Sequence, residues 1–234
     1  MSQPKRVMIV GGTQGIGLEI ARHYAGRGSE VIVTGRDLAK AQTAAREIGG
    51  KTSALAFDLA KPEAIEAALA GVDAIDGLVL AAIERDQNNI RTYDIARATH
   101  LVLLKLVGYS EVIHTLLPKF PSEGGAIVLF GGLAKDRPYP GSTTVSTVNG
   151  GVTTMVHSLA VQIPPVRINA IHPGIVGDSP YWKGNEAYLE TIKARTPGGR
   201  LVRMQDIVGA VAFLLENEAV NGENLRVDNG WMVM

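Results

Sequence analysis

The sequence predicts a three-layer α/β/α sandwich in which a seven-stranded parallel sheet lies between two layers of helices. Short apolar runs alternate with amphipathic segments along the whole chain, and a glycine-rich turn follows the first apolar run. The 234 residues contain no linker, repeat or low-complexity tract, and 46% of them are hydrophobic. We therefore expect a single domain over residues 1–234, with one large core.

The first strand, turn and helix are predicted at residues 7–27. Val7 to Val10 is an apolar run typical of a buried parallel strand, and an amphipathic helix follows the turn. A turn of this kind can be an ordinary tight turn, but between a strand and a helix it favours a pyrophosphate cradle, because glycines allow close backbone approach. The residues expected in the cradle are Gly11, Thr13, Gln14, Gly15, Ile16 and Gly17.

The spacing Gly11-x-x-x-Gly15-x-Gly17 resembles the TGxxxGxG turn of the short-chain dehydrogenase/reductase family, with Val10 in place of the threonine. The resemblance extends along nearly the whole chain and implies a Rossmann-like fold and a nicotinamide cofactor. It includes an acid after an apolar run, a degraded NNAG segment over residues 80–83 and a Pro-Gly turn. The cofactor-binding residues that it implies are Asp58, Leu59, Ala81, Ala82, Pro173, Gly174 and Val176.

The end of the second predicted strand indicates which cofactor binds. An acid there would bind the 2′-hydroxyl of NAD(H), whereas this chain has Gly35, which would leave room, followed by Arg36. Arginine can pair with a 2′-phosphate, although a solvated surface arginine would give the same pattern. We therefore expect NADP(H).

The resemblance implies a catalytic Asn-Ser-Tyr-Lys set, and this chain has other residues at all four positions. A gap-free alignment over residues 125–154 places Gly132 at the serine, Val145 at the tyrosine and Asn149 at the lysine, while Lys105 takes the place of the asparagine. Valine cannot donate a proton, so reduction of ordinary ketones is expected to be difficult. Asn149 keeps a donor and an acceptor for the nicotinamide ribose.

Several nearby side chains are alternatives for the missing acid. Asp136, Arg137 and Tyr139 lie in the loop after the fifth strand, where a solvated charged loop is an equally good interpretation. Lys105 either reaches the same region or is a solvated, snorkelling lysine. His172 is expected to be a packed residue at the end of a strand.

Residues 177–199 are rich in Pro, Gly and aromatic side chains and follow a predicted strand. In the family that the chain resembles, this segment forms a substrate lid; the other interpretation is a long surface loop. The family also pairs its fourth and fifth helices between subunits. Because residues 101–117 and 152–163 are apolar on more than one face, we expect a homo-oligomer, either a dimer or a tetramer.

Composition argues against several other classes of protein. The formal net charge is 0, with no basic stripe for nucleic acid, and no apolar stretch approaches the roughly 20 residues of a membrane span. We find no signal-peptide pattern and expect a cytoplasmic location. The chain has no cysteine, and its histidines lack a metal-ligand spacing.

The sequence as a whole predicts an NADP(H)-dependent oxidoreductase with atypical catalysis on a small-molecule substrate. Iminium-like or activated double-bond acceptors fit, since they are polarised before hydride arrives. The alternatives are an NADP(H)-binding sensor or scaffold without turnover and a non-redox catalyst on the same fold.

Overall fold

The structure, a computed structural model, describes residues 3–234 and contains one seven-stranded sheet. Its strand order is β3-β2-β1-β4-β5-β6-β7, and every neighbouring pair is parallel. The strands are β1 (Arg6–Val10), β2 (Glu30–Gly35), β3 (Thr52–Ala56), β4 (Gly77–Leu80), β5 (Ala126–Phe130), β6 (Arg167–Pro173) and β7 (Asn224–Val227). The predicted sheet is confirmed.

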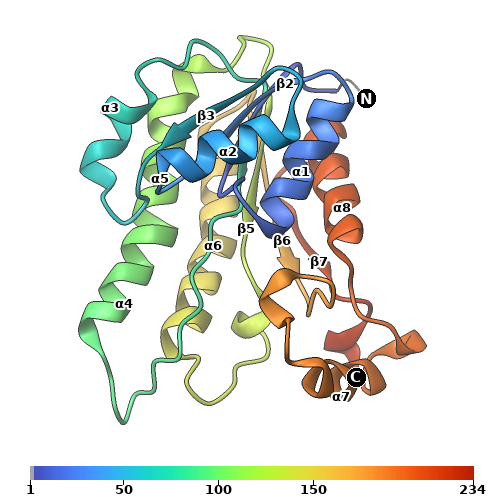
Figure 1. The fold of residues 1–234 in the computed structure, drawn as a ribbon. Helices are drawn as coiled ribbons and strands as arrows, with labels where there is room; N and C mark the ends of the chain where they lie inside the picture. Colours follow the sequence, from blue (N-terminus) through green and yellow to red (C-terminus); the bar gives the residue numbers. More distant parts are fainter. Residues whose placement is uncertain (1–2) are drawn as a thin grey trace.

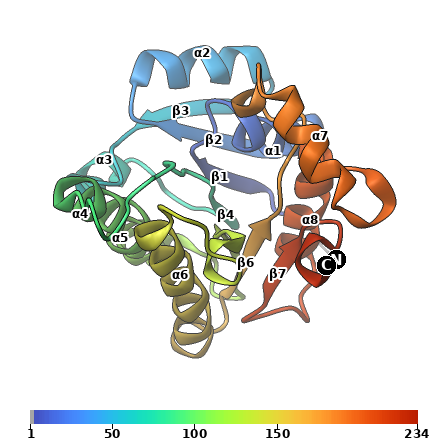
Figure 2. The same ribbon diagram turned by 90° about the horizontal axis from the view of Figure 1, so that it is seen from below.

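Helices cover both faces of the sheet, as Figures 1 and 2 show. One layer contains α1 (Gly15–Gly26), α2 (Leu38–Ile48) and α8 (Met204–Glu216). The other contains α3 (Ile65–Leu69), α4 (Ile95–Val102), α5 (Gly108–Leu116) and α6 (Thr143–Gln162). A further helix, α7 (Glu186–Ala194), lies beyond the sheet in the predicted lid segment.

Two apolar clusters hold the layers together, one on each face. Because side chains alternate along a strand, Met8 and Val10 of β1 join the cluster under α5 and α6, while Val7 and Ile9 join the one under α1 and α8. All four side chains are almost completely buried. Burial on both faces explains why the strands read as continuous apolar runs.

The strand order reverses direction between β1 and β4. In doubly wound sheets, ligands bind at the carboxyl ends of the strands at such a switch point. Figure 1 shows the loops before α4 and α6 and the α7 segment gathered at that same end of the sheet. The fold therefore places the glycine turn, both loops and the predicted lid around one region.

One long helix runs from Ile95 to Lys119 and combines α4, a π-helical turn over Leu103–Val107, and α5. By length and composition it is apolar enough to cross a membrane, with a mean hydropathy of 1.4. The sequence analysis did not identify this helix as long and apolar enough, because polar residues interrupt its apolar runs. Within the fold, 44% of its most apolar window is buried, and the helix contacts α6.

Candidate active site

The glycine turn brings the end of β1 very close to the end of β4. The backbone N–H groups of Gly11 and Gly12 both donate to the carbonyl oxygen of Thr34 at 3.1 Å. A Cβ atom added to Gly11, which has a φ of +86°, would lie 2.7 Å from the Ala82 backbone, and one added to Gly17 would lie 2.1 Å from the Gly11 oxygen. Side chains are therefore excluded at both positions.

The start of α1 faces open space. Its N-cap residue, Gln14, is extended and makes no capping bond through its side chain. The first N–H groups of the helix therefore keep their hydrogen-bonding capacity, and the helix dipole adds partial positive charge there. A Cβ atom added to Gly15 would meet nothing within 4 Å. This cradle fits the pyrophosphate of a dinucleotide.

Arg36 lies just after β2 and has a partner that the sequence analysis missed. Its guanidinium donates to Glu84 at 2.6 Å, and the other oxygen of Glu84 lies 2.9 Å from Nε2 of His100. Arg36 remains 64% exposed. The sequence analysis expected Gly35 to leave space for the cofactor, but Thr13 occupies that space. A Cβ atom added to Gly35 would lie 2.9 Å from the Thr13 methyl group. A 2′-phosphate at Arg36 would thus compete with Glu84.

The other predicted cofactor residues lie around the same edge of the sheet. Asp58 accepts a hydrogen bond from the Ala60 N–H at 3.0 Å, while the Leu59 side chain is buried in the core and leaves only its backbone available. The residues at the ends of β4 and β6 are Ala81, Ala82, Pro173, Gly174 and Val176. Ala82 accepts a bond from the Tyr109 hydroxyl at 2.7 Å, which fixes the loop after β4.

Lys105 is buried, with 4% of its surface exposed, and this settles the question that the sequence left open. It belongs to the π-helical turn, a feature often found at functional sites. Its ammonium donates to Oδ1 of Asn149 at 3.3 Å and to the Gly131 carbonyl at 3.4 Å. Burial lowers the pKa of Lys105 to about 7. Val145 precedes Asn149 by about one turn of α6.

Gly132 leaves the space that the Asn149 amide occupies. A Cβ atom added to Gly132 would lie 2.7 Å from Nδ2 of Asn149. The Gly132 N–H donates to Nδ1 of His172 at 3.1 Å, and Nε2 of His172 lies 2.9 Å from Oδ1 of Asn224. These partners assign the proton to Nε2, and burial lowers the pKa of His172. His172 is the packed residue that was expected.

The three loop residues that the sequence analysis named as possible proton donors differ in their surroundings. Asp136 pairs with Lys135 at 2.7 Å, and Arg137 stacks on the Trp231 ring at 4.4 Å from its centroid. Tyr139 is 51% exposed, and its hydroxyl has no hydrogen-bond partner within residues 3–234. Partial burial raises the pKa of Tyr139, which is opposite to the lowered pKa of an activated tyrosine acid.

The predicted lid contacts the loop after β4 through aromatic side chains. Arg85 of that loop stacks on Tyr181 at 3.5 Å from the ring centroid, and Trp182 stacks on Tyr188 at 5.3 Å between centroids. Asp178 accepts a hydrogen bond from the Met204 N–H at 2.8 Å and so ties the lid to α8. The role of Arg85 had no signal in the sequence, because it depends on two loops distant along the chain.

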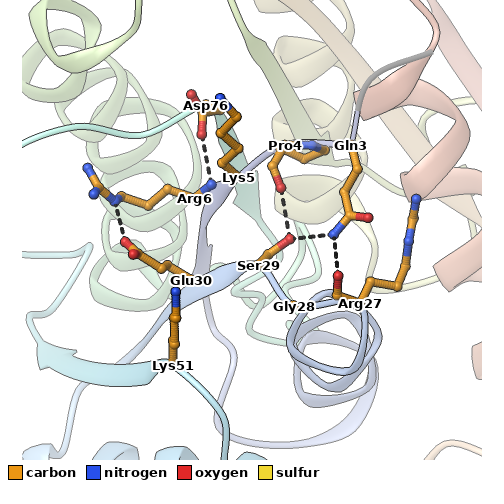
Figure 3. A pocket seen from close by; sticks show the side chains of 10 residues that line it. All are labelled: Gln3, Pro4, Lys5, Arg6, Arg27, Gly28, Ser29, Glu30, Lys51 and Asp76. Atoms are coloured by element: carbon orange, nitrogen blue, oxygen red, sulfur yellow. Dashed lines mark hydrogen bonds and ion pairs between the residues drawn. The ribbon is translucent and has the colours of Figure 1, made fainter.

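A surface cavity of about 630 Å³ lies at the opposite end of the sheet, where β1 and β2 begin. Figure 3 shows its walls, in which Arg6 pairs with Glu30 and Ser29 contacts Gln3. The glycine turn and Lys105 do not line this cavity. We therefore place the candidate site at the carboxyl ends of the strands.

Comparisons with known proteins show which family the chain belongs to. The family described as Enoyl-(Acyl carrier protein) reductase matches residues 10–232. The 3-oxoacyl-[acyl-carrier-protein] reductase of Bos taurus is 29% identical over 232 residues, which are 95% of each chain. A solved short chain dehydrogenase/reductase family protein is 26% identical, with a TM-score of 0.88 over 98% of this chain and 97% of its own.

The MalC Reductase/Diels-Alderase from Malbranchea aurantiaca is 22% identical, and it shares the fold with a TM-score of 0.91 over 98% of this chain and 97% of its own. The match over residues 10–232 includes the glycine turn, all the strands after β1 and the lid segment. The chain therefore belongs to the short-chain dehydrogenase/reductase family, whose members use nicotinamide cofactors, and it is an oxidoreductase.

Proposed function

We propose that this oxidoreductase depends on NADP(H) and reduces an acceptor that is already polarised, such as an activated double bond or an iminium ion. The observation that carries the proposal is Val145, an apolar residue one turn before Asn149, where the family resemblance implies a tyrosine acid. Without that acid, the substrate itself must make hydride addition favourable.

The residues at the sheet edge support the choice of cofactor. The cradle at Gly11, Gly15 and Gly17 would hold the pyrophosphate, and Arg36 would bind the 2′-phosphate in exchange for Glu84. The backbone of Ile175 and Val176 would face the nicotinamide carboxamide. When bound in its reduced form, the cofactor supplies hydride.

The test combines cofactor binding with a panel of acceptors. NADPH at about a hundred times its dissociation constant should add roughly 2.7 kcal/mol to the free energy of unfolding, which a thermal shift detects. NADPH oxidation should then be observed with conjugated enones or iminium salts and be negligible with simple ketones.

Two results would contradict the proposal. Absence of a thermal shift with NADP(H) would remove the cofactor assignment. Efficient reduction of simple ketones, lost in Tyr139→Phe, would mean that Tyr139 supplies the proton and that catalysis is not of the proposed kind.

A further inference from the structure

We propose that Lys105 and Asn149 act as one unit, in which Lys105 orients the Asn149 amide so that its N–H group binds an oxygen that becomes negative during reduction. This inference rests on the proposed function and narrows its substrate class. It favours double bonds conjugated to a carbonyl over iminium ions.

The hydrogen bonds define the orientation of the amide. A charged Lys105 ammonium has hydrogen-bond donors but no acceptor. The Asn149 atom that it contacts at 3.3 Å must therefore be the acceptor, Oδ1. Nδ2 then points toward Gly132, and it has no hydrogen-bond partner within residues 3–234. Nδ2 is not among the side-chain atoms of residues 3–234 that are sealed from solvent without a hydrogen-bond partner, so it keeps some accessible surface.

Gly132 makes this arrangement possible. Its φ of 179° is extended backbone that any residue adopts, so conformation does not explain the glycine. Space does explain it, because an added Cβ would lie 2.7 Å from Nδ2 of Asn149. The amide therefore occupies the place in which the resemblance implies a serine hydroxyl.

The charges around Lys105 favour a developing anion. Its hydrogen-bond partners, Asn149 and the Gly131 carbonyl, are both neutral. Titratable groups on the packed elements include His172 on β6, whose pKa burial lowers, and Tyr109 on α5, whose hydroxyl bonds to Ala82. Lys135, after β5, pairs with Asp136 at 2.7 Å. No carboxylate of residues 3–234 pairs with the ammonium of Lys105. Negative charge at Asn149 is thus stabilised, whereas an iminium ion is repelled.

The reaction balances for a conjugated carbonyl. Hydride adds to the β-carbon, the electron pair of the C=C bond moves toward the carbonyl oxygen, and the resulting enolate oxygen accepts the N–H of Asn149. The α-carbon then takes a proton from water, so that one hydride and one proton are consumed. When Lys105 is neutral, the positive charge that favours this step is absent. The rate of the step therefore depends on pH.

The activity test uses Lys105→Met and Asn149→Ala, with Lys119→Met, at the end of the same long helix, as the control for loss of a lysine. The probes are 2-cyclohexen-1-one and N-methyl-3,4-dihydroisoquinolinium. Asn149→Ala should lower kcat/KM for the enone about a hundredfold and Lys105→Met about tenfold. In Lys105→Met, the NADPH dissociation constant should change less than about twofold. Faster reduction of the iminium probe than of the enone by the unmodified protein would overturn the substrate preference.

A second readout needs no turnover. In the unmodified protein, the side-chain amide resonances of Asn149 should shift as the pH crosses about 7, the pKa of Lys105, and in Lys105→Met they should not. If the Asn149 amide resonances do not change with pH in either protein, the inference is overturned. If no acceptor is reduced at all, the proposed function fails. The Asn149 amide resonances would still show whether Lys105 and Asn149 interact.

Discussion

Lys105 lies where a lysine is energetically costly. It is 4% exposed, and its two hydrogen-bond partners are neutral. Desolvation of an ammonium disfavours its charged form, and here no carboxylate within residues 3–234 offsets that cost. A residue that lowers stability in this way is typical of a functional site, where stability and activity are in conflict.

We therefore expect Lys105→Met to be more stable than the unmodified protein at pH 7. Because burial lowers the folded pKa to about 7 from 10.5, the unfolded chain holds more protons between these values, and stability rises with pH across this window. At about 1.4 kcal/mol per unit, the gain in the variant is a few kcal/mol at pH 7 and shrinks toward pH 10. Chemical denaturation at pH 7 and pH 9 measures the difference, and an equal gain at both values would contradict it.

Arg36 gives a second prediction for single residues. Glu84→Gln removes the carboxylate that competes with a 2′-phosphate, so NADPH affinity should rise up to about fivefold, the usual worth of an exposed ion pair. NADH affinity should stay the same, since NADH lacks that phosphate. Arg36→Ala should reduce the difference between the affinities for NADPH and NADH. Equal calorimetric affinities for NADPH and NADH in the unmodified protein would refute this account.

At the scale of elements, the predicted lid segment, residues 177–199, contacts the loop after β4. Arg85→Ala removes a cation stacked on Tyr181, an interaction worth roughly 1–2 kcal/mol, and should speed amide hydrogen exchange in residues 180–188 by about tenfold. Arg91→Ala in the same loop is the control, because Arg91 makes no such stacking contact. Unchanged exchange in Arg85→Ala would show that the lid is held by other contacts.

The elements also show which features the sequence can predict. The strands and the turn at Gly11 follow from local patterns, since buried parallel strands are apolar throughout and a close backbone approach requires glycine. The burial of Lys105 does not follow, because a π-helical turn shifts the faces of a helix relative to a regular period. The partner of Arg36, Glu84, lies 48 residues away in the loop after β4. The partner of Arg85, Tyr181, lies in the predicted lid segment, about a hundred residues away. Local sequence patterns do not reveal such distant contacts.

At the scale of the whole molecule, the helix layer of α4 to α6 leaves apolar side chains at its surface. Leu101, Leu104 and Leu116 are buried within the subunit, but Val107 is 43% exposed and Val161 is 78% exposed. These helices form one side of the molecule in Figure 2. The apolar surface left for pairing is therefore narrower than the composition of residues 101–117 and 152–163 indicated.

We predict a symmetric homo-oligomer that pairs through this layer. Light scattering at micromolar concentration should give a multiple of 24.8 kDa, and Val107→Asp should shift the mass toward the monomer, because a charge buried in a pairing surface is left uncompensated. Phe213→Asp on α8 is the matched control, since Phe213 is 45% exposed on the opposite layer and should leave the mass unchanged. A monomeric mass for the unmodified protein would refute the prediction.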